Sequence, residues 1–333
     1  MVEVEFDSAE AAAGFWPPAW FGRELTGDPA WANQSLASVG LPDRRLEHRL
    51  RPGEDPGTGV CRVITTRAAE AAAAARAAGE AADPASQVHE ARKCLKKVRS
   101  ALRMLRGVID DGQRQTANQT CREASRRLAG ARDAEVKLAT LETIAAEGTA
   151  AELRHHFERE AEEHRAELTP QSLGDVARQI ESVARDFRGR ELPGAGEAIA
   201  GNVERSYRRG RKAMKKAAEA GRPEDFHRWR KRAKDLRYQL EILEPEVSAS
   251  FADTRKQVEE LADLLGDLHD LDVLAEDLER REPGSDDLGR LSALIAQARG
   301  AKARDCLEQG QKIYGAKSKR FARSLRKELG PAG

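Results

Sequence analysis

Residues 88–99 read VHEARKCLKKVR, and residues 226–237, which lie 138 positions later, read FHRWRKRAKDLR. Both segments place His, Arg, Lys, Lys and Arg at the same positions. Their apolar residues recur at alternating steps of three and four, which is the spacing of one buried face of an α-helix. The residue after each apolar one lies about 100° further round the helix, so a basic stripe runs beside the buried stripe. We interpret the two segments as copies of one helical unit.

A second pair of segments extends the repeat. Residues 128–136 and 265–273 share a Leu, a stretch of small residues, an Asp (Asp133 or Asp270) and a Val three positions after it, at an offset of 137. Neither half has a large enough apolar face to be stable alone. The tandem copies therefore predict two similar helix bundles related by an approximate twofold axis.

The composition predicts an all-α protein after an atypical N-terminal segment. From residue 66 onward the chain is rich in Ala, Glu, Arg, Leu and Lys, which are strong helix formers. We expect helices at 66–82, 86–107, 113–146, 150–167, 171–189, 197–220, 223–244, 247–281, 286–312 and 316–329.

The first sixty residues differ from the rest of the chain. They hold Trp16, Trp20 and Trp31 and six of the 13 Pro. We expect residues 1–60 to be irregular, with a small hairpin through 45–50 and 60–65. A helical domain over 61–330 would then hold the first repeat at about 66–190 and the second at about 197–330.

The net charge of +1 and the pI of about 7.7 argue at first against a polyanion-binding protein. The charges are not evenly spread, however. The 55 residues in 88–106, 205–216, 226–237 and 316–327 carry a net +24, so the other 278 carry −23. Like charges one helical turn apart repel each other. Clusters of positive charge with few acids among them are expected at a site that binds a polyanion, because the bound anion neutralises the cations.

Several classes of protein are excluded by what the sequence lacks. It has no apolar run long enough to span a membrane and no signal-peptide pattern. Cys61, Cys94, Cys121 and Cys306 stand alone, which favours a reducing cytoplasm over a disulfide framework or a zinc site. No P-loop, HExxH, GxSxG or Rossmann motif is present, so we expect no catalytic residues and no cofactor.

These segments together resemble the CHAD family, which is named for conserved histidines on an α-helical domain. The resemblance covers about residues 60–330 and rests on 89–99, 128–136, 207–211, 227–238 and 265–274. It implies two four-helix bundles with a basic central groove or pore that binds inorganic polyphosphate. Members often occur at polyphosphate granules, which implies a cytoplasmic location there.

This sequence departs from the family's pattern in two places. His269 stands where such proteins commonly have Asn or Arg, and the helix at 66–82 is less basic than its partner at 203–217. The groove would therefore be asymmetric. Some members also carry a triphosphate-tunnel catalytic domain, and sixty N-terminal residues are too few for one.

We predict that basic residues from both repeats bind the non-bridging oxygens of polyphosphate without hydrolysing it. Imidazoles near pKa 6.5 would donate hydrogen bonds from the same face and gain charge beside the anion. The predicted residues are His89, Arg92, Lys93, Lys96 and Arg99 in the first repeat and His227, Arg230, Lys231, Lys234 and Arg237 in the second, extended by Arg208, Arg209, Arg211, Lys212, Lys215, Lys319, Arg320 and Arg323.

Metal sites are the first alternative. A divalent cation at His89 and His227 would be repelled by the fixed positive charges around them, so we expect no metal there. The acids Asp263, Asp267, Asp270 and Asp272 offer the oxygen ligands that Mg²⁺ prefers. We favour a role in holding the side chains of the basic helices, because a cluster of cations needs to be oriented.

Other functions use similar electrostatics. Proteins that bind single-stranded nucleic acid place aromatic rings among their cations so that bases can stack. Here Trp229 falls on the buried stripe, and Tyr207 and Tyr238 are the aromatic residues near cations. We keep sequence-independent duplex binding as the alternative function, followed by a metal-dependent phosphoanhydride hydrolase.

Overall fold

The structure is a computed structural model that describes residues 47–81, 83–145, 150–244, 249–280 and 286–329, together with Val4, Phe6, Ser8 and Phe15. The chain separates into two units, Met1–Arg44 and Arg45–Gly333. The second unit contains every helix of the described residues. Trp16, Trp20 and Trp31 of the predicted N-terminal segment lie outside the described residues.

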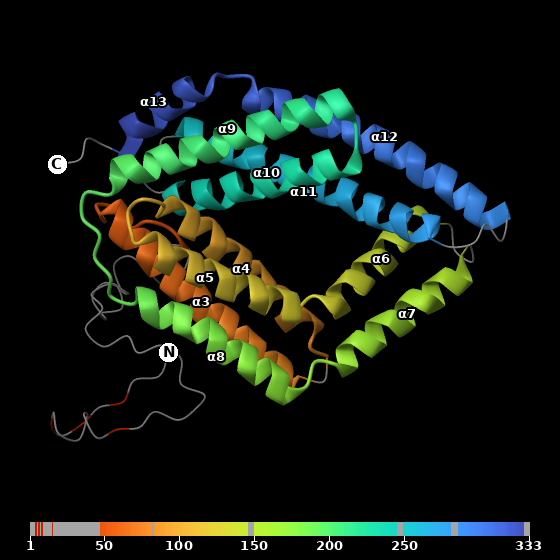
Figure 1. Cartoon of the computed structure of the whole chain (residues 1–333), viewed down its shortest axis with the longest axis horizontal. Helices are drawn as coiled ribbons and strands as arrows, with labels where there is room; N and C mark the ends of the chain where they lie inside the picture. The colour runs from red at the N-terminus through yellow and green to blue at the C-terminus, as the bar shows by residue number, and fades with distance from the viewer. Residues whose placement is uncertain are drawn as a thin grey trace. The chain divides into compact units, whose positions relative to one another are not determined.

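The described residues form eleven α-helices and no β-strand, which confirms the predicted all-α fold (Figure 1). The helices are α3 (Pro56–Glu80), α4 (Ala85–Met104), α5 (Asp111–Arg127), α6 (Gly130–Ile144), α7 (Ala151–Ala166), α8 (Pro170–Phe187), α9 (Gly196–Ala220), α10 (Pro223–Leu243), α11 (Ala249–Glu279), α12 (Asp286–Tyr314) and α13 (Ser318–Leu329).

Helix α3 begins earlier than predicted. Asp55 caps it by accepting hydrogen bonds from the backbone N–H groups of Gly57 and Thr58, and Pro56 occupies the first turn. The predicted hairpin through 45–50 and 60–65 is therefore wrong. Residues 60–65 belong to this helix, and Val63 and Ile64 lie on its buried face.

The predicted single helix at 113–146 is divided in two. Helix α5 ends at Arg127, and α6 begins at Gly130 after a break at Leu128 and Ala129. Helix α6 then packs against α7 and α11. The corresponding α11 of the second repeat is continuous.

The helices pack as two related bundles. In the first, α3 packs against α4 and α8, while α5 packs against α4 and α8. In the second, α9 packs against α10, α12 and α13, and α10 packs against α11. Helices α3, α4 and α8 thus correspond to α9, α10 and α13, and α4 packs against α10 where the bundles meet.

Each apolar stripe predicted from the repeat is buried. The residues are Val88, Ala91, Leu95, Val98, Leu102 and Leu105 on α4 or just after it, and Phe226, Trp229, Ala233, Leu236, Leu240 and Leu243 on α10. A separate small core joins α6, α7, α11 and α12 through residues such as Leu141, Phe157, Leu274 and Ile295. The apolar stripes of α4 and α10 face the two cores. The polar residues beside these stripes are therefore available for the contact between the bundles.

Close packing in the second bundle can be tested at Gly310, where a Cβ atom would lie 2.5 Å from Cζ2 of the fully buried Trp229. We expect Gly310→Ala to lower the free energy of unfolding by about 1–3 kcal/mol, because the core is overpacked. Urea denaturation followed by circular dichroism measures this change.

Gly289→Ala, also on α12, is the matched control, because no atom lies within 4 Å of its added Cβ. It should leave stability unchanged or raise it by up to about 1 kcal/mol through helix propensity. Equal stability of the two variants would contradict the close packing.

Candidate functional site

The two repeats meet where α4 crosses α10. The Ser100 hydroxyl donates to the backbone carbonyl of Asp235 over 2.8 Å. Ion pairs flank this contact, between Lys97 and Glu241 at 2.6 Å and between Arg103 and Asp235 at 3.2 Å. The 138-residue offset maps Lys97 onto Asp235 and Arg103 onto Glu241, so the two pairs are equivalent under the pseudo-twofold axis. In both pairs the first repeat supplies the cation and the second supplies the acid.

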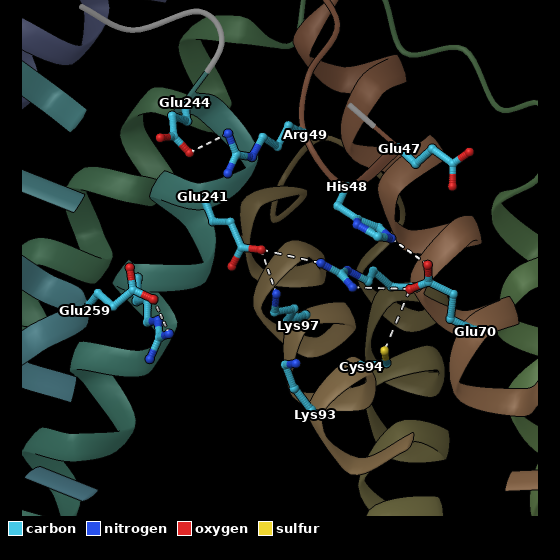
Figure 2. A network of polar contacts seen from close by, with 12 residues as sticks. Glu47, His48, Arg49, Glu70, Lys93, Cys94, Lys97, Glu241, Glu244 and Glu259 are labelled. Atoms are coloured by element: carbon cyan, nitrogen blue, oxygen red, sulfur yellow. Dashed lines mark hydrogen bonds and ion pairs between the residues drawn. The ribbon is translucent and has the colours of Figure 1, made fainter. Parts of the chain in front are cut away.

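A network of charged residues extends from the first of these pairs into the first bundle (Figure 2). Arg67 of α3 pairs with both Glu241 at 3.4 Å and Glu70 at 3.2 Å. Arg49, in the turn before α3, pairs with Glu244 at the end of α10. Carboxylates therefore neutralise the cations on this side of the crossing, and the network holds the bundles together.

The opposite flank of α4 has a different charge balance. Arg99 lies about 200° around the helix from Lys97. There Lys234 of α10 interacts electrostatically with Lys96, and Lys231 interacts with Arg99 and with Arg122 of α5. We call Lys96, Arg99, Arg122, Arg230, Lys231 and Lys234 the crossing cluster. The structure thus brings together basic residues from both predicted stripes.

The two lysines from α10 lie among other cations. Among the described residues, no acid forms an ion pair with Lys231 or Lys234. Burial, acting with the charges of Arg230 and Lys96, lowers the pKa of Lys234 to about 8, and the charge of Asp263 acts in the opposite direction. Burial also lowers the pKa of Lys231, with further contributions from neighbouring arginines. An anion would relieve this mutual repulsion.

The repeated arginines have structural partners. Arg92 donates to the backbone carbonyl of Ala129 over 3.0 Å and pairs with Asp133 at 3.2 Å. Its counterpart Arg230 is partly buried, and the charge of Asp270 offsets part of the burial effect that lowers the arginine's pKa. The two repeated sequence motifs are therefore in contact with each other within each repeat. Arg92, predicted as a phosphate ligand, also serves to attach α6.

The acids of α11 hold basic side chains. Asp263 pairs with Arg237 of the predicted stripe at 2.8 Å. Asp267 and Asp272 pair instead with cations of α12, Lys302 at 3.1 Å and Arg299 at 2.7 Å. Asp263 therefore holds a side chain of a basic helix, as expected. Asp267 and Asp272 hold side chains of α12, which carries neither basic stripe.

The equivalent arginines at the end of each stripe differ in charge balance. Arg237 pairs with Glu259 as well as Asp263. Arg99 donates to the amide oxygen of Asn118 over 3.2 Å and has no ion pair with a carboxylate of the described residues. The site is therefore asymmetric, with more of its unneutralised charge at the first-repeat end.

The histidines of the two repeats also differ. His89 is exposed, whereas Nδ1 of His227 lies 3.1 Å from Nδ1 of His269 on α11. Burial lowers the pKa of His227 to about 4 and that of His269 to about 3, with Lys231 and Arg230 acting in the same direction. Both pKa values thus lie well below the value of 6.5 expected from the sequence.

Helix α9 divides its predicted cations between two sides. Arg209 interacts with Arg232 of α10 and with Arg106, so it lies beside the crossing. Arg211, about 200° away round the helix, donates to the backbone carbonyl of Tyr314 over 3.0 Å near the start of α13.

The other predicted cations are exposed on the surface. Lys93 of α4 forms an ion pair with Glu90 at 3.2 Å. The rest lie on α9 and α13, namely Arg208, Lys212, Lys215, Lys319, Arg320 and Arg323.

Sequence reasoning missed Arg122, Arg232, Arg106 and the pairing of His269. Arg122 belongs to α5, outside the four basic runs, and only tertiary packing brings it to the cluster. His269 had a signal, since it stands out from the family's pattern in the second repeated segment.

Possible metal ligands gather elsewhere. Within the part of the chain that the structure describes, the group whose ligand atoms all lie within 4.8 Å of one another is Glu47, His48 and Glu70. It includes neither His89 and His227 nor the acids of α11. Helices long and apolar enough to cross a bilayer are absent from the described residues.

The facing histidines make stability depend on pH. Their pKa values in the folded protein lie below the ordinary value of 6.5, so the unfolded chain binds protons first as the pH falls. This contribution to stability is complete above about pH 6.5 and is lost toward pH 4. We expect His269→Asn to lose less stability than the wild type between pH 7 and pH 4.5, as measured by thermal unfolding.

The exposed His155 of α7 provides the control. His155→Asn should follow the wild-type pH profile. If His269→Asn followed it too, the two histidines would not face each other as described.

Comparisons with known proteins agree with this architecture. Residues 63–279 match the CHAD domain family. The crystal structure of the CHAD domain from the plant Ricinus communis is 18% identical, covers 85% of this chain and 96% of its own, and superposes with a TM-score of 0.52. An inorganic triphosphatase of Nitrosomonas europaea is 54% identical over 37 residues, which are 11% of this chain. The matched stretch spans 24% of that protein's length.

Proposed function

Because the chain belongs to the CHAD family, we propose that it binds inorganic polyphosphate, or a shorter chain such as triphosphate, at the crossing cluster. The observation that carries the proposal is the gathering of cations from both repeats around Lys231 and Lys234, neither of which forms an ion pair with a carboxylate of the described residues. Phosphate oxygens would accept charge-assisted hydrogen bonds from these side chains. They would also raise the lowered pKa of Lys234 toward its ordinary value.

The surroundings of the cluster favour inorganic phosphate over nucleic acid. Base recognition in single strands uses exposed aromatic rings. Trp229 and Tyr207 are buried, and Tyr238 is 9% exposed. The cations can therefore follow a chain of phosphates, but these rings are not available to stack on a base. Duplex binding through the backbone alone is the competing function.

Binding without hydrolysis is the second part of the proposal. Cleavage of a phosphoanhydride bond by a metal-dependent enzyme requires carboxylates that hold metal ions against the phosphates. Near the cluster, Asp263 is paired with Arg237 and Asp267 with Lys302. These acids neutralise protein cations, which supports a binding role. We place this function in the cytoplasm, at polyphosphate granules.

Charge reversal at Lys231 and Lys234 tests the binding site. We expect Lys231→Glu/Lys234→Glu to weaken long-chain polyphosphate binding by about tenfold or more for each reversed charge, because a hydrogen bond to a charged group contributes roughly 1.5–3 kcal/mol. Fluorescence anisotropy with labelled polyphosphate measures the affinity. The variant should also have a shallower dependence of log affinity on log salt concentration.

The matched control is Arg159→Glu/Arg188→Glu, which makes the same change in net charge at exposed residues of α7 and the end of α8. It should bind as the wild type does. Equal loss in both variants would mean that net charge, and not the crossing cluster, determines binding. Competition by duplex DNA at equal phosphate concentration would favour the alternative function.

Hydrolysis is tested by a time course. The wild-type protein, incubated with tripolyphosphate or long-chain polyphosphate and Mg²⁺ or Mn²⁺, should release no phosphate above the rate of buffer with metal. Release that depends on protein concentration would overturn the non-catalytic part of the proposal while leaving the binding site intact.

A further inference from the structure

Helix α9 carries an exposed basic ridge outside the crossing cluster. Arg208, Lys212 and Lys215 are exposed and lie within about 60° of one another around the helix axis. No carboxylate of the described residues forms an ion pair with any of them. Lys216 is different, because it pairs with the buried Asp225 at 3.5 Å.

Helix α13 adds two more cations beside this ridge. The ring of Phe321 stacks on that of Tyr207 at 4.3 Å between centroids. Arg326 pairs with Glu197 at 2.7 Å, toward the start of α9, so α13 runs antiparallel to α9. Lys319 and Arg323 share the face of Arg326, since they precede it by seven and three residues. They therefore border the exposed side of α9.

Arg209 connects the ridge to the crossing cluster. Burial lowers its pKa, and Arg232 of α10 is the largest further cause. Lys212 lies about 60° further round α9 from Arg209. Cations thus follow one another from Arg232 of α10, which pairs with Asp235 at 3.4 Å, across α9 to the border with α13. The acid Glu197 at the far end is already paired with Arg326.

We infer that this outer surface, made of Arg208, Lys212, Lys215, Lys319 and Arg323, binds the part of a polyphosphate chain that extends beyond the crossing cluster. The inference rests on the proposed function and gives the two surfaces different tasks. The crossing cluster binds chains of any length, and the outer surface binds only chains long enough to cross α9. The protein then prefers long chains because they occupy both surfaces at once.

A series of polyphosphates of increasing length, starting from tripolyphosphate, tests the inference. The variant Arg208→Gln/Lys212→Gln/Lys215→Gln removes three exposed charges without burying or exposing apolar surface. Its affinity should equal that of the wild type for the shortest chains. For long chains its affinity should be about tenfold lower, because three phosphate contacts are lost. The control Arg159→Gln/Arg188→Gln/Arg290→Gln removes equal charge from other exposed positions and should match the wild type at every length.

Each other outcome overturns a specific statement. If the outer-surface variant and the wild type have equal affinities at all lengths, the outer surface does not bind polyphosphate. If their affinities differ by the same factor at all lengths, the two surfaces are not separate. Failure of the wild type to bind at any length would instead refute the proposed function itself. If Lys231→Glu/Lys234→Glu loses binding and the outer-surface variant does not, the crossing cluster remains the proposed binding site and the outer surface has no part in binding.

Discussion

The contact between α4 and α10 forces like charges together, and the rest of the site depends on how that repulsion is balanced. Lys97 and Arg103 form ion pairs with Glu241 and Asp235 of the other repeat. Beside these pairs, Lys231 and Lys234 interact with cations of the first repeat and form no ion pair with a carboxylate of the described residues. The ion pairs and the buried Ser100 contact hold the helices in place. Lys231 and Lys234 can therefore remain close to other cations in the folded protein.

Much of this arrangement could be predicted from one sequence, because it is local. The steps of three and four fixed which residues of α4 and α10 are buried, and the position beside them fixed the basic stripes. Contacts between distant segments were beyond such reasoning. Arg122 joins the cluster from α5, and Arg92 reaches Asp133 after a break in the helix that composition did not predict. Pairings of this kind depend on tertiary packing, which a periodic pattern does not encode.

The internal repeat accounts for the symmetry of the site, and differences between the two copies account for its asymmetry. The arginine that joins the two repeated motifs is kept in both copies, as Arg92 with Asp133 and as Arg230 beside Asp270. The last arginine of each stripe is also kept but has different partners, since Arg99 contacts an amide whereas Arg237 is paired with carboxylates. The copies thus share the contacts that position the helices and differ in those that set the local charge.

The net charge of +1 is consistent with a strongly cationic site, because salt limits the range over which charges act. At physiological ionic strength, exposed charges separated by more than about 8 Å are largely screened from each other. A ligand beside Lys234 therefore responds to Lys96, Arg230 and their neighbours on adjacent helices. The acids of the rest of the chain lower the total charge without cancelling that local field. The local field is therefore set by where the cations are placed and not by the net charge of the chain.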